Sequence, residues 1–211
     1  LEGNGCTCHR KFRFYNWFHR VAGQTFAEYM DDRPARLRNT IVRKQRKLER
    51  EHRCQFRLAA RDNLDQCLAD YHAVYRSSWK ASEQFADYVD RIVIAMSNRE
   101  WLRLVILYID DQPAAAQIWF VVQGKASIFK LAYDEKWNNY SPGSILTAQL
   151  MQQVIDIDGV EEIDFLTGDD AYKQDWMSWR RERWSIVCAM PRIEHNRPVG
   201  LAGLLKKMIG R

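Results

Sequence analysis

The spacing of apolar residues along the chain predicts an alternation of short strands and amphipathic helices. Apolar runs of strand length lie at residues 12–21, 54–58, 101–109, 114–122, 126–133, 162–166 and 184–189. Helical spacing is found at residues 25–30, 34–52, 64–79, 82–97, 142–156 and 172–179. From residue 54 onward the predicted order is β-α-α-β-β-β-α-β-α-β, which indicates an α/β fold with a central sheet flanked by helices.

The helix that follows the polar loop after residue 133 begins with the sequence Ser141-Pro142-Gly143. Ser141 suits the N-cap, and Pro142 suits the first helical position, where no N–H is required. The amides of Gly143, Ser144 and Ile145 would then lack helical partners and point outward with the positive end of the helix dipole. Such a helix start can bind an anion, often a nucleotide phosphate, although a well-capped helix with nothing bound has the same sequence.

A second polar cluster follows the strand predicted at residues 162–166 and contains Asp169, Asp170, Tyr172 and Lys173. Ligand sites in α/β folds tend to lie at the ends of buried strands. Either carboxylate could accept a proton from an ammonium group, or the pair could cap the next helix. Lys173 could bind a phosphate or a carboxylate, or form a surface ion pair, and Tyr172 could be a core aromatic residue.

Taken together, the element order, the Ser-Pro-Gly helix start and the Gly-Asp-Asp-x-Tyr-Lys sequence resemble one family. It is the CelD/BcsL-type acetyltransferases, a bacterial branch of the GNAT superfamily related to the FemABX peptidoglycan aminoacyltransferases. Segments at residues 16–17, 26–29 and 36–40 resemble it too, so the resemblance runs from about residue 12 to residue 191. It implies the GNAT fold and acyl transfer from acetyl-CoA or another acyl-CoA to an amine. The acceptor would be an amino sugar or another precursor of the cell envelope or an exopolysaccharide.

Acyl transfer from a thioester to an amine requires a bound donor, a neutral amine and a stabilised thiolate. We expect Asp169 or Asp170 to accept the amine proton, and the resemblance implies that Tyr172 donates a proton to the thiolate. The donor-binding residues would be Ser141, Gly143, Ser144, Ile145 and Lys173. Most GNAT proteins have a longer Gly-rich loop at this position, whereas this chain has only Ser-Pro-Gly-Ser.

The net charge of +5 is concentrated in one segment, residues 33–53. Nine Lys or Arg residues against two Glu give this segment a charge of +7, which leaves −2 for the remainder of the chain. A basic helix of this kind could meet phosphates of RNA, coenzyme A or lipids, or it could be a solvated bridge between two lobes. No aromatic residues are interleaved with the charges, which argues against binding of single-stranded nucleic acid.

The 211 residues can form one large domain, or one domain and part of another. We expect the tail of a preceding lobe at residues 1–32, a basic linker helix at 33–53, a GNAT-like domain at 54–191 and an amphipathic segment at 192–211. Because the chain begins with Leu1 rather than Met, we expect it to be a piece of a longer protein.

No apolar run approaches the roughly 20 residues that span a bilayer, so no transmembrane segment is expected. The five cysteines fit no disulfide scaffold, which favours the reducing cytoplasm. Neither they nor the five histidines show metal-ligand spacing, so we expect no metal cofactor.

Two alternatives to an acyl-CoA enzyme remain open at the level of sequence. One is FemX-like transfer from aminoacyl-tRNA, in which the basic helix would contact the RNA. The other is a non-catalytic, GNAT-shaped module of a polysaccharide-assembly complex. The sequence identifies neither the acceptor nor the acyl group, and it leaves open whether the protein forms a homodimer.

Overall fold

The computed structural model describes residues 7–80 and 85–189, so the C-terminal segment predicted at residues 192–211 lies outside the described residues. The chain divides into two compact units. The core unit is Phe14–Glu182. The described part of the second unit, called the ribbon unit below, consists of residues 7–13 and 183–189. Each unit is described by itself.

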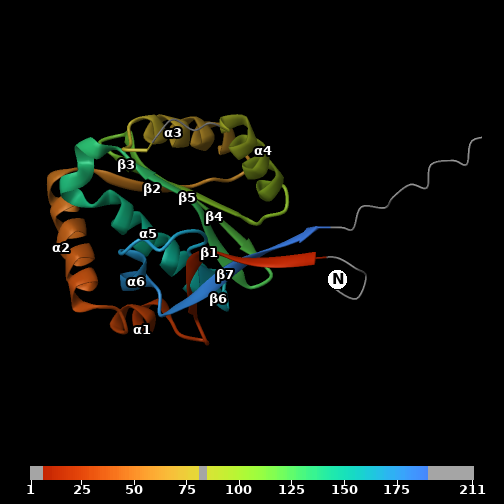
Figure 1. Ribbon diagram of the computed structural model, residues 1–211. Helices are drawn as coiled ribbons and strands as arrows, with labels where there is room; N and C mark the ends of the chain where they lie inside the picture. The colour runs from red at the N-terminus through yellow and green to blue at the C-terminus, as the bar shows by residue number, and fades with distance from the viewer. Residues whose placement is uncertain (1–6, 81–84, 190–211) are drawn as a thin grey trace, which may run out of the picture. The chain divides into compact units, whose positions relative to one another are not determined.

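Within the described residues, seven strands form one sheet in the order β2-β3-β4-β5-β6-β1-β7 (Figure 1). The strands are β1 (Thr7–Arg20), β2 (Cys54–Leu58), β3 (Leu102–Ile109), β4 (Gln112–Val122), β5 (Lys125–Tyr133), β6 (Glu162–Asp164) and β7 (Trp179–Ala189). Strands β2 to β5 pair with antiparallel neighbours, as do β1 and β6. Strands β5 and β6 are parallel, so the sheet is mixed.

Helices cover both faces of the sheet in the core unit (Figure 1). The helices are α1 (Phe26–Asp31), α2 (Ala35–Glu51), α3 (Leu64–Arg76), α4 (Ala86–Ser97), α5 (Pro142–Gln152) and α6 (Lys173–Trp176). Side chains of β3 point alternately to the two faces. Leu104 and Ile106 pack in the core beneath α3 and α4, whereas Val105 and Leu107 pack in the core formed with α1, α2 and α5.

The predicted order of elements from residue 54 onward is confirmed, with different boundaries toward its end. The helix predicted at residues 172–179 is only the single turn of α6, and β7 begins at Trp179 rather than at residue 184. The first half of β7 is mostly exposed and rich in charged residues, so no apolar pattern marks it. The loop predicted before α5 contains the 3₁₀ helix η2 (Glu135–Tyr140), and α5 continues into the π-helical turn η3 (Gln153–Ile157).

A buried carboxylate joins four strands of the core unit. Asp164 on β6 is only 1% exposed. One of its oxygens accepts hydrogen bonds from Asn16 at 2.6 Å and from the backbone N–H of Leu166 at 2.7 Å. The other lies 2.7 Å from both Lys125 on β5 and Arg181 on β7. Burial alone would raise the pKa of Asp164, but these partners outweigh it and lower the pKa.

His19 is a second buried polar residue of the core unit. Its Nδ1 lies 2.9 Å from Ser178 Oγ and its Nε2 lies 3.3 Å from Gln24 Oε1, which suits a neutral ring. The ring stacks on Trp179 with centroids 5.4 Å apart. Burial, with the nearby guanidinium of Arg33, lowers the pKa of His19 from 6.5 to about 4.

We expect His19 to make the protein less stable in mild acid. As the pH falls through 6.5, the unfolded chain binds a proton that the folded ring accepts only near pH 4. Between neutral pH and about pH 5, this residue should therefore remove about 2 kcal/mol of folding free energy. Urea denaturation at both pH values should show this slope in the wild type and a flatter one in His19→Gln. An equal slope in the two proteins would contradict the assignment.

The ribbon unit brings together two cysteines that are far apart in the sequence. The Sγ atoms of Cys8 and Cys188 lie 2.8 Å apart and are exposed. Beside them, Phe12 and Trp184 meet edge to face at 5.6 Å, and Arg10 lies 4.0 Å from the centre of the Trp184 ring. Spacing in the sequence gave no indication of this proximity.

We expect diamide to oxidise Cys8 and Cys188 to an intramolecular disulfide, with loss of two hydrogens. Because Cys6 lies outside the described residues, the experiment should use a Cys6→Ser background. Burial raises the pKa of the Cys54 and Cys67 thiols, so both should react slowly. Peptide mapping after alkylation measures the crosslink, and Cys8→Ser is the control. A product that joins any other pair of cysteines would refute the expectation.

Candidate active site

The parallel strands β5 and β6 pair over only three residues and then diverge. The register runs from Lys125 opposite Glu162 to Ser127 opposite Asp164. Beyond Asp164 the chain turns toward β1, where the Phe165 N–H donates to the carbonyl of Trp17 at 2.9 Å. From residue 128 to its end, β5 therefore has no strand neighbour on the side of β6 within the described part of the chain. This unpaired side is called the open edge of β5 below.

A β-bulge lies at the point of divergence. Opposite β4, Ile128 pairs with Trp119 and Lys130 pairs with Ile118, so Phe129 is the extra residue. A bulge changes the direction of the strand and of its backbone groups. The end of β5 leads through η2 into α5, so the start of this helix lies just beyond the open edge (Figure 1).

The start of α5 differs from the sequence prediction. Ser141 is left-handed, with φ of 53°, and its side chain makes no capping hydrogen bond. The amides of Ser144 and Ile145 were expected to be free, but both donate to the carbonyl of Ser141, at 3.0 and 3.2 Å. The prediction of three outward amides was therefore wrong for two of them. The left-handed turn brings the Ser141 carbonyl, rather than its hydroxyl, to the helix start.

Gly143 lies beneath an aromatic ring. It is buried, and a Cβ atom at this position would lie 3.0 Å from Cδ1 of Tyr133. Trp79 packs against Tyr133 with ring centroids 4.5 Å apart. The glycine is needed here because the ring comes so close.

Two buried polar side chains that the sequence prediction missed hold the first turn of α5. Gln117 on β4 donates to the carbonyl of Gly143 at 3.0 Å and to Thr147 at 2.8 Å. Its side-chain oxygen accepts the indole N–H of Trp119 at 2.8 Å. A single Gln in the run Ala-Ala-Ala-Gln-Ile-Trp was the available signal, because a buried amide requires partners.

Lys173 is a buried clamp on the loop that follows β6. Its side chain is 5% exposed, and its Nζ donates to the carbonyls of Phe165, Thr167 and Gly168 at 3.3, 2.6 and 3.4 Å. It also pairs with Asp170 at 3.1 Å. Because the Lys173 side chain is buried, the alternative that it forms an ion pair at the surface was wrong. The ammonium group of Lys173 therefore holds this loop, and the predicted phosphate contact stays a prediction.

The two aspartates of this loop have different surroundings. Asp169 accepts the indole N–H of Trp17 at 2.6 Å with one oxygen and pairs with Arg180 at 3.1 Å with the other. Asp170 contacts Lys173 through Oδ2, its side chain is 61% exposed, and its Oδ1 makes no polar contact with the described residues. Asp170 therefore has one oxygen open to a ligand, whereas each oxygen of Asp169 already has a partner in the chain.

Tyr172 is half exposed beside the same loop. Its ring centroid lies 6.3 Å from that of Phe165. Partial burial, with the charge of Asp170, raises the pKa of Tyr172 to about 12, so the hydroxyl keeps its proton at neutral pH. No hydrogen bond or ion pair within the described residues connects this loop with the residues 141–145 at the start of α5.

The basic helix α2 is attached to the loop before α5. Lys44 donates to the carbonyl of Asn139 at 2.5 Å, and Lys47 lies 4.6 Å from the centre of the Tyr140 ring. Tyr140 donates to Glu51 at 2.9 Å and lies 3.1 Å from His52 Nε2. The helix is therefore part of the core unit and packs beside the candidate site, which the interpretation as a bridge between lobes did not anticipate.

The described residues contain neither a metal-binding cluster nor a membrane-spanning helix. No group of three or more His, Cys, Asp or Glu residues in this part of the chain is placed to hold a metal ion. None of its helices has the length and apolar character required to cross a bilayer.

Solved structures with this fold include several larger proteins. FemX is 9% identical with a TM-score of 0.63, and the match covers 95% of this chain and 65% of that one. A conserved protein of unknown function from Bacteroides thetaiotaomicron VPI-5482 is 12% identical with a TM-score of 0.62, over 88% and 62% of the two chains. The C-terminal domain of a putative lysylphosphatidylglycerol synthetase from Agrobacterium fabrum is 13% identical with a TM-score of 0.60, over 95% and 64%.

These likenesses show a common fold, and the chain spans less than two thirds of the length of each of the three proteins. No curated protein matches the chain at a significant level. A family model described as an acetyltransferase (GNAT) domain matches residues 35–174, from the beginning of α2 to α6. This match covers more than half of the sequence and agrees with the mixed, helix-flanked sheet. The chain therefore belongs to the GNAT acetyltransferase domain family.

Proposed function

We propose that the protein is an acyl-CoA-dependent N-acyltransferase, specifically an acetyltransferase of the CelD/BcsL type. The observation that carries the proposal is the divergence of β5 and β6 after three paired residues, with α5 beginning beyond the open edge of β5. An unpaired strand edge offers backbone groups to an extended, amide-containing donor arm. We place the thioester near the bulge at Phe129.

In the proposed reaction, an amine attacks the thioester carbonyl directly. Asp170 first removes one proton from the acceptor ammonium group, because its exposed carboxylate has an oxygen open to a ligand, and the neutral amine then attacks. The nitrogen loses its second proton after the attack, and this proton replaces the one that Tyr172 donates. The C–N bond forms, the C–S bond breaks, and the thiolate takes the proton of Tyr172. The raised pKa of Tyr172 keeps this proton in place until a stronger base, the leaving thiolate, reaches it. Lys173 and Asp169 position the loop.

The donor site can be tested at Ser144, the third residue of α5, which is partly exposed. An aspartate in the first turn of a helix favours the helix dipole, so Ser144→Asp should fold at least as well as the wild type. The same charge repels a donor phosphate. We expect Ser144→Asp to weaken acetyl-CoA binding at least about 10-fold by calorimetry, a loss of about 1.4 kcal/mol.

Ser144→Asn is the matched control, because it has the same size without the charge and should keep its affinity. Wild-type affinity in Ser144→Asp, with clear binding of acetyl-CoA, would place the donor elsewhere. No detectable binding of acetyl-CoA or longer acyl-CoAs to the wild type would overturn the proposed donor.

A second candidate is aminoacyl transfer from aminoacyl-tRNA. The likeness to FemX favours it, together with the basic helix beside the candidate site. Binding to tRNA should fall steeply with salt, because each neutralised phosphate releases counterions. Salt-sensitive tRNA binding without acyl-CoA binding would favour this candidate.

For the acyl-CoA enzyme, the proposed acceptor is an amine of a cell-envelope or exopolysaccharide precursor in the cytoplasm, and a panel of amino sugars tests it.

A further inference from the structure

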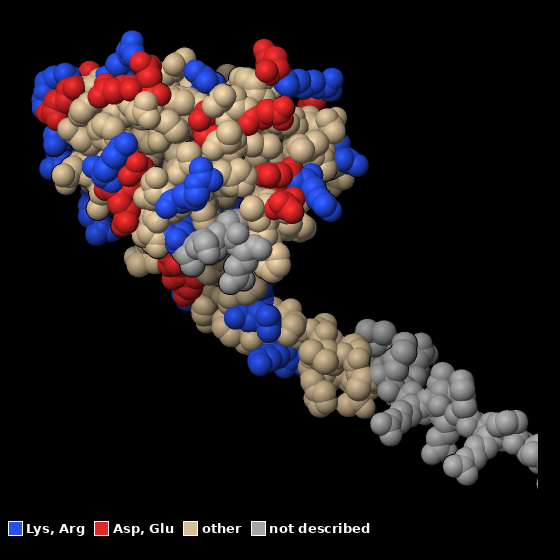
Figure 2. All heavy atoms as spheres, turned by 90° about the horizontal axis from the view of Figure 1, so that it is seen from above, with Lys and Arg blue, Asp and Glu red and all other residues tan. Residues whose placement is uncertain are grey.

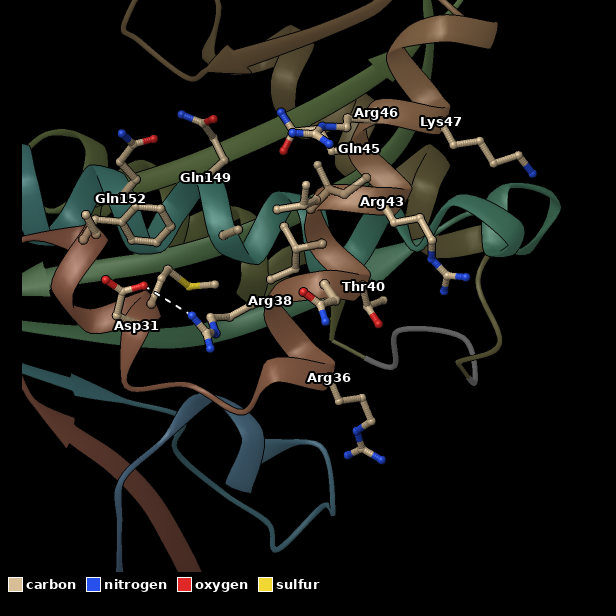
Figure 3. A pocket seen from close by; sticks show the side chains of 18 of the residues that line it. Asp31, Arg36, Arg38, Thr40, Arg43, Gln45, Arg46, Lys47, Gln149 and Gln152 are labelled. Carbon is tan, nitrogen blue, oxygen red and sulfur yellow. Dashed lines mark hydrogen bonds and ion pairs between the residues drawn. The ribbon is translucent and has the colours of Figure 1, made fainter.

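A groove of about 1280 Å³ lies in the core unit between α1, α2 and α5, on the outer side of α5. It does not include the open edge of β5 or the loop after β6. Figure 3 shows it from close by. Its apolar lining comes from all three helices and from β2, with Met30, Ile41, Phe56, Ile145 and Ala148.

The groove is strongly basic. Six Lys or Arg residues line it, against one Asp. Arg36, Lys47 and Arg50 have carboxylate partners in the chain. Arg43 and Arg46, in the middle of α2, form no side-chain hydrogen bond or ion pair within the described residues. Positive charge without a protein counter-charge is therefore concentrated at the middle of the helix.

Hydrogen-bond donors on α2 and α5 line the groove. In Figure 3 the side chain of Arg46 extends from α2 over the groove, on the side of Gln149, and Gln152 projects from the same face of α5. Arg38 pairs with Asp31 at 3.3 Å through one terminal nitrogen. Its Nε is inaccessible to solvent and has no acceptor.

An exposed apolar side chain lies beside these cations. Val42 lines the groove next to Ile41 and is 47% exposed. By contrast, Figure 2 shows Lys and Arg interspersed with Asp and Glu over the α3–α4 face. The two phenylalanines of the groove, Phe26 and Phe56, are only partly exposed and belong to the core, so they offer no stacking platform for bases.

We propose that this groove binds an anionic phospholipid of a membrane surface. The headgroup phosphate would lie beside Arg46 and the side-chain amides of Gln149 and Gln152. An acyl chain would cover Ile41 and Ala148, and Val42 would enter the boundary between headgroups and chains. A phospholipid would contact both the cations and the apolar lining of the groove, whereas RNA would contact the cations alone. The proposal is independent of the acyl-transfer chemistry.

Sedimentation with vesicles tests the proposal. The wild type should bind phosphatidylcholine vesicles that contain phosphatidic acid and should not bind pure phosphatidylcholine. Arg43→Gln/Arg46→Gln should weaken the binding about 10–30-fold, because each basic residue near an anionic surface contributes to the attraction. Val42→Glu should weaken it also, and this residue is exposed enough for the variant to fold.

The matched control is Arg76→Gln/Arg91→Gln, which removes the same charge from α3 and α4 and should retain binding. A short-chain, monomeric phosphatidic acid should raise the melting temperature of the wild type and not that of the Arg43/Arg46 variant. Equal losses in the two double variants, or no preference for anionic vesicles, would overturn the proposal. So would RNA binding that depends on Arg43 and Arg46 without any vesicle binding.

Discussion

Asp170→Asn is expected to lower the turnover number by about 10²–10⁴-fold at neutral pH, the range for loss of a general base. The amide keeps the size of the side chain but cannot accept the proton of the attacking amine. Because its partner Lys173 also donates to three carbonyls, the loop should keep its conformation. Donor affinity should change little. Release of coenzyme A in the presence of glucosamine, or of an amine found by screening, measures the turnover.

Asp169→Asn is the matched control for this experiment. Its two oxygens are engaged by Trp17 and Arg180, so the variant should lose some stability and keep most of its turnover. If Asp169→Asn were the inactive variant and Asp170→Asn the active one, the roles would have to be exchanged. Full turnover in both variants would remove the proton acceptor from this loop.

Lys125→Met/Arg181→Met is expected to lower the free energy of unfolding by about 3–5 kcal/mol, because it leaves the buried Asp164 carboxylate without a cation. The pKa of Asp164 should rise, because burial raises it and the two cations that oppose this effect are gone. The free energy of unfolding of this variant should therefore improve relative to the wild type as the pH falls. Urea denaturation at two pH values measures both effects.

Two further variants define the origin of that loss. Adding Asp164→Leu should restore a large part of the stability, because an apolar residue in place of the buried charge removes the need for cations. Arg180→Met breaks the exposed pair with Asp169 and should cost less than about 1 kcal/mol. A double variant as stable as Arg180→Met would show that the buried carboxylate does not depend on Lys125 and Arg181.

Much of the fold could be predicted because the central strands have local patterns. Strand Cys54–Leu58 has the predicted boundaries, and β3 and β4 are nearly continuous apolar runs. The short β6 and the exposed half of β7 were harder, because their place depends on pairing with distant residues. Phe18, for example, lies opposite Asp164 across the sheet. The sequence pattern within about ten residues does not indicate which distant strand a segment pairs with.

The candidate site was predictable as a set of residues, but their environments were not. Ser141 was expected to cap α5, yet η2 delivers it in a left-handed conformation, and Tyr133 covers Gly143. Lys173 was expected to bind a phosphate or a carboxylate, with a surface ion pair as the alternative, and its burial among the loop carbonyls was not predicted. These outcomes depend on contacts between elements. The proposed roles of the predicted site residues stay predictions until the variants are measured.

Deuterium uptake along the second half of β5 should alternate from residue to residue. In an antiparallel pair, successive residues direct their amide groups toward one neighbour and then away from it. Between Ile128 and Tyr133, amides that face β4 are held in the ladder, while the alternate ones face no strand within the described residues. Exchange should be slow for the first set and fast for the second. A donor seated along this edge would remove the alternation, so the exchange pattern would locate the donor without any assay of turnover.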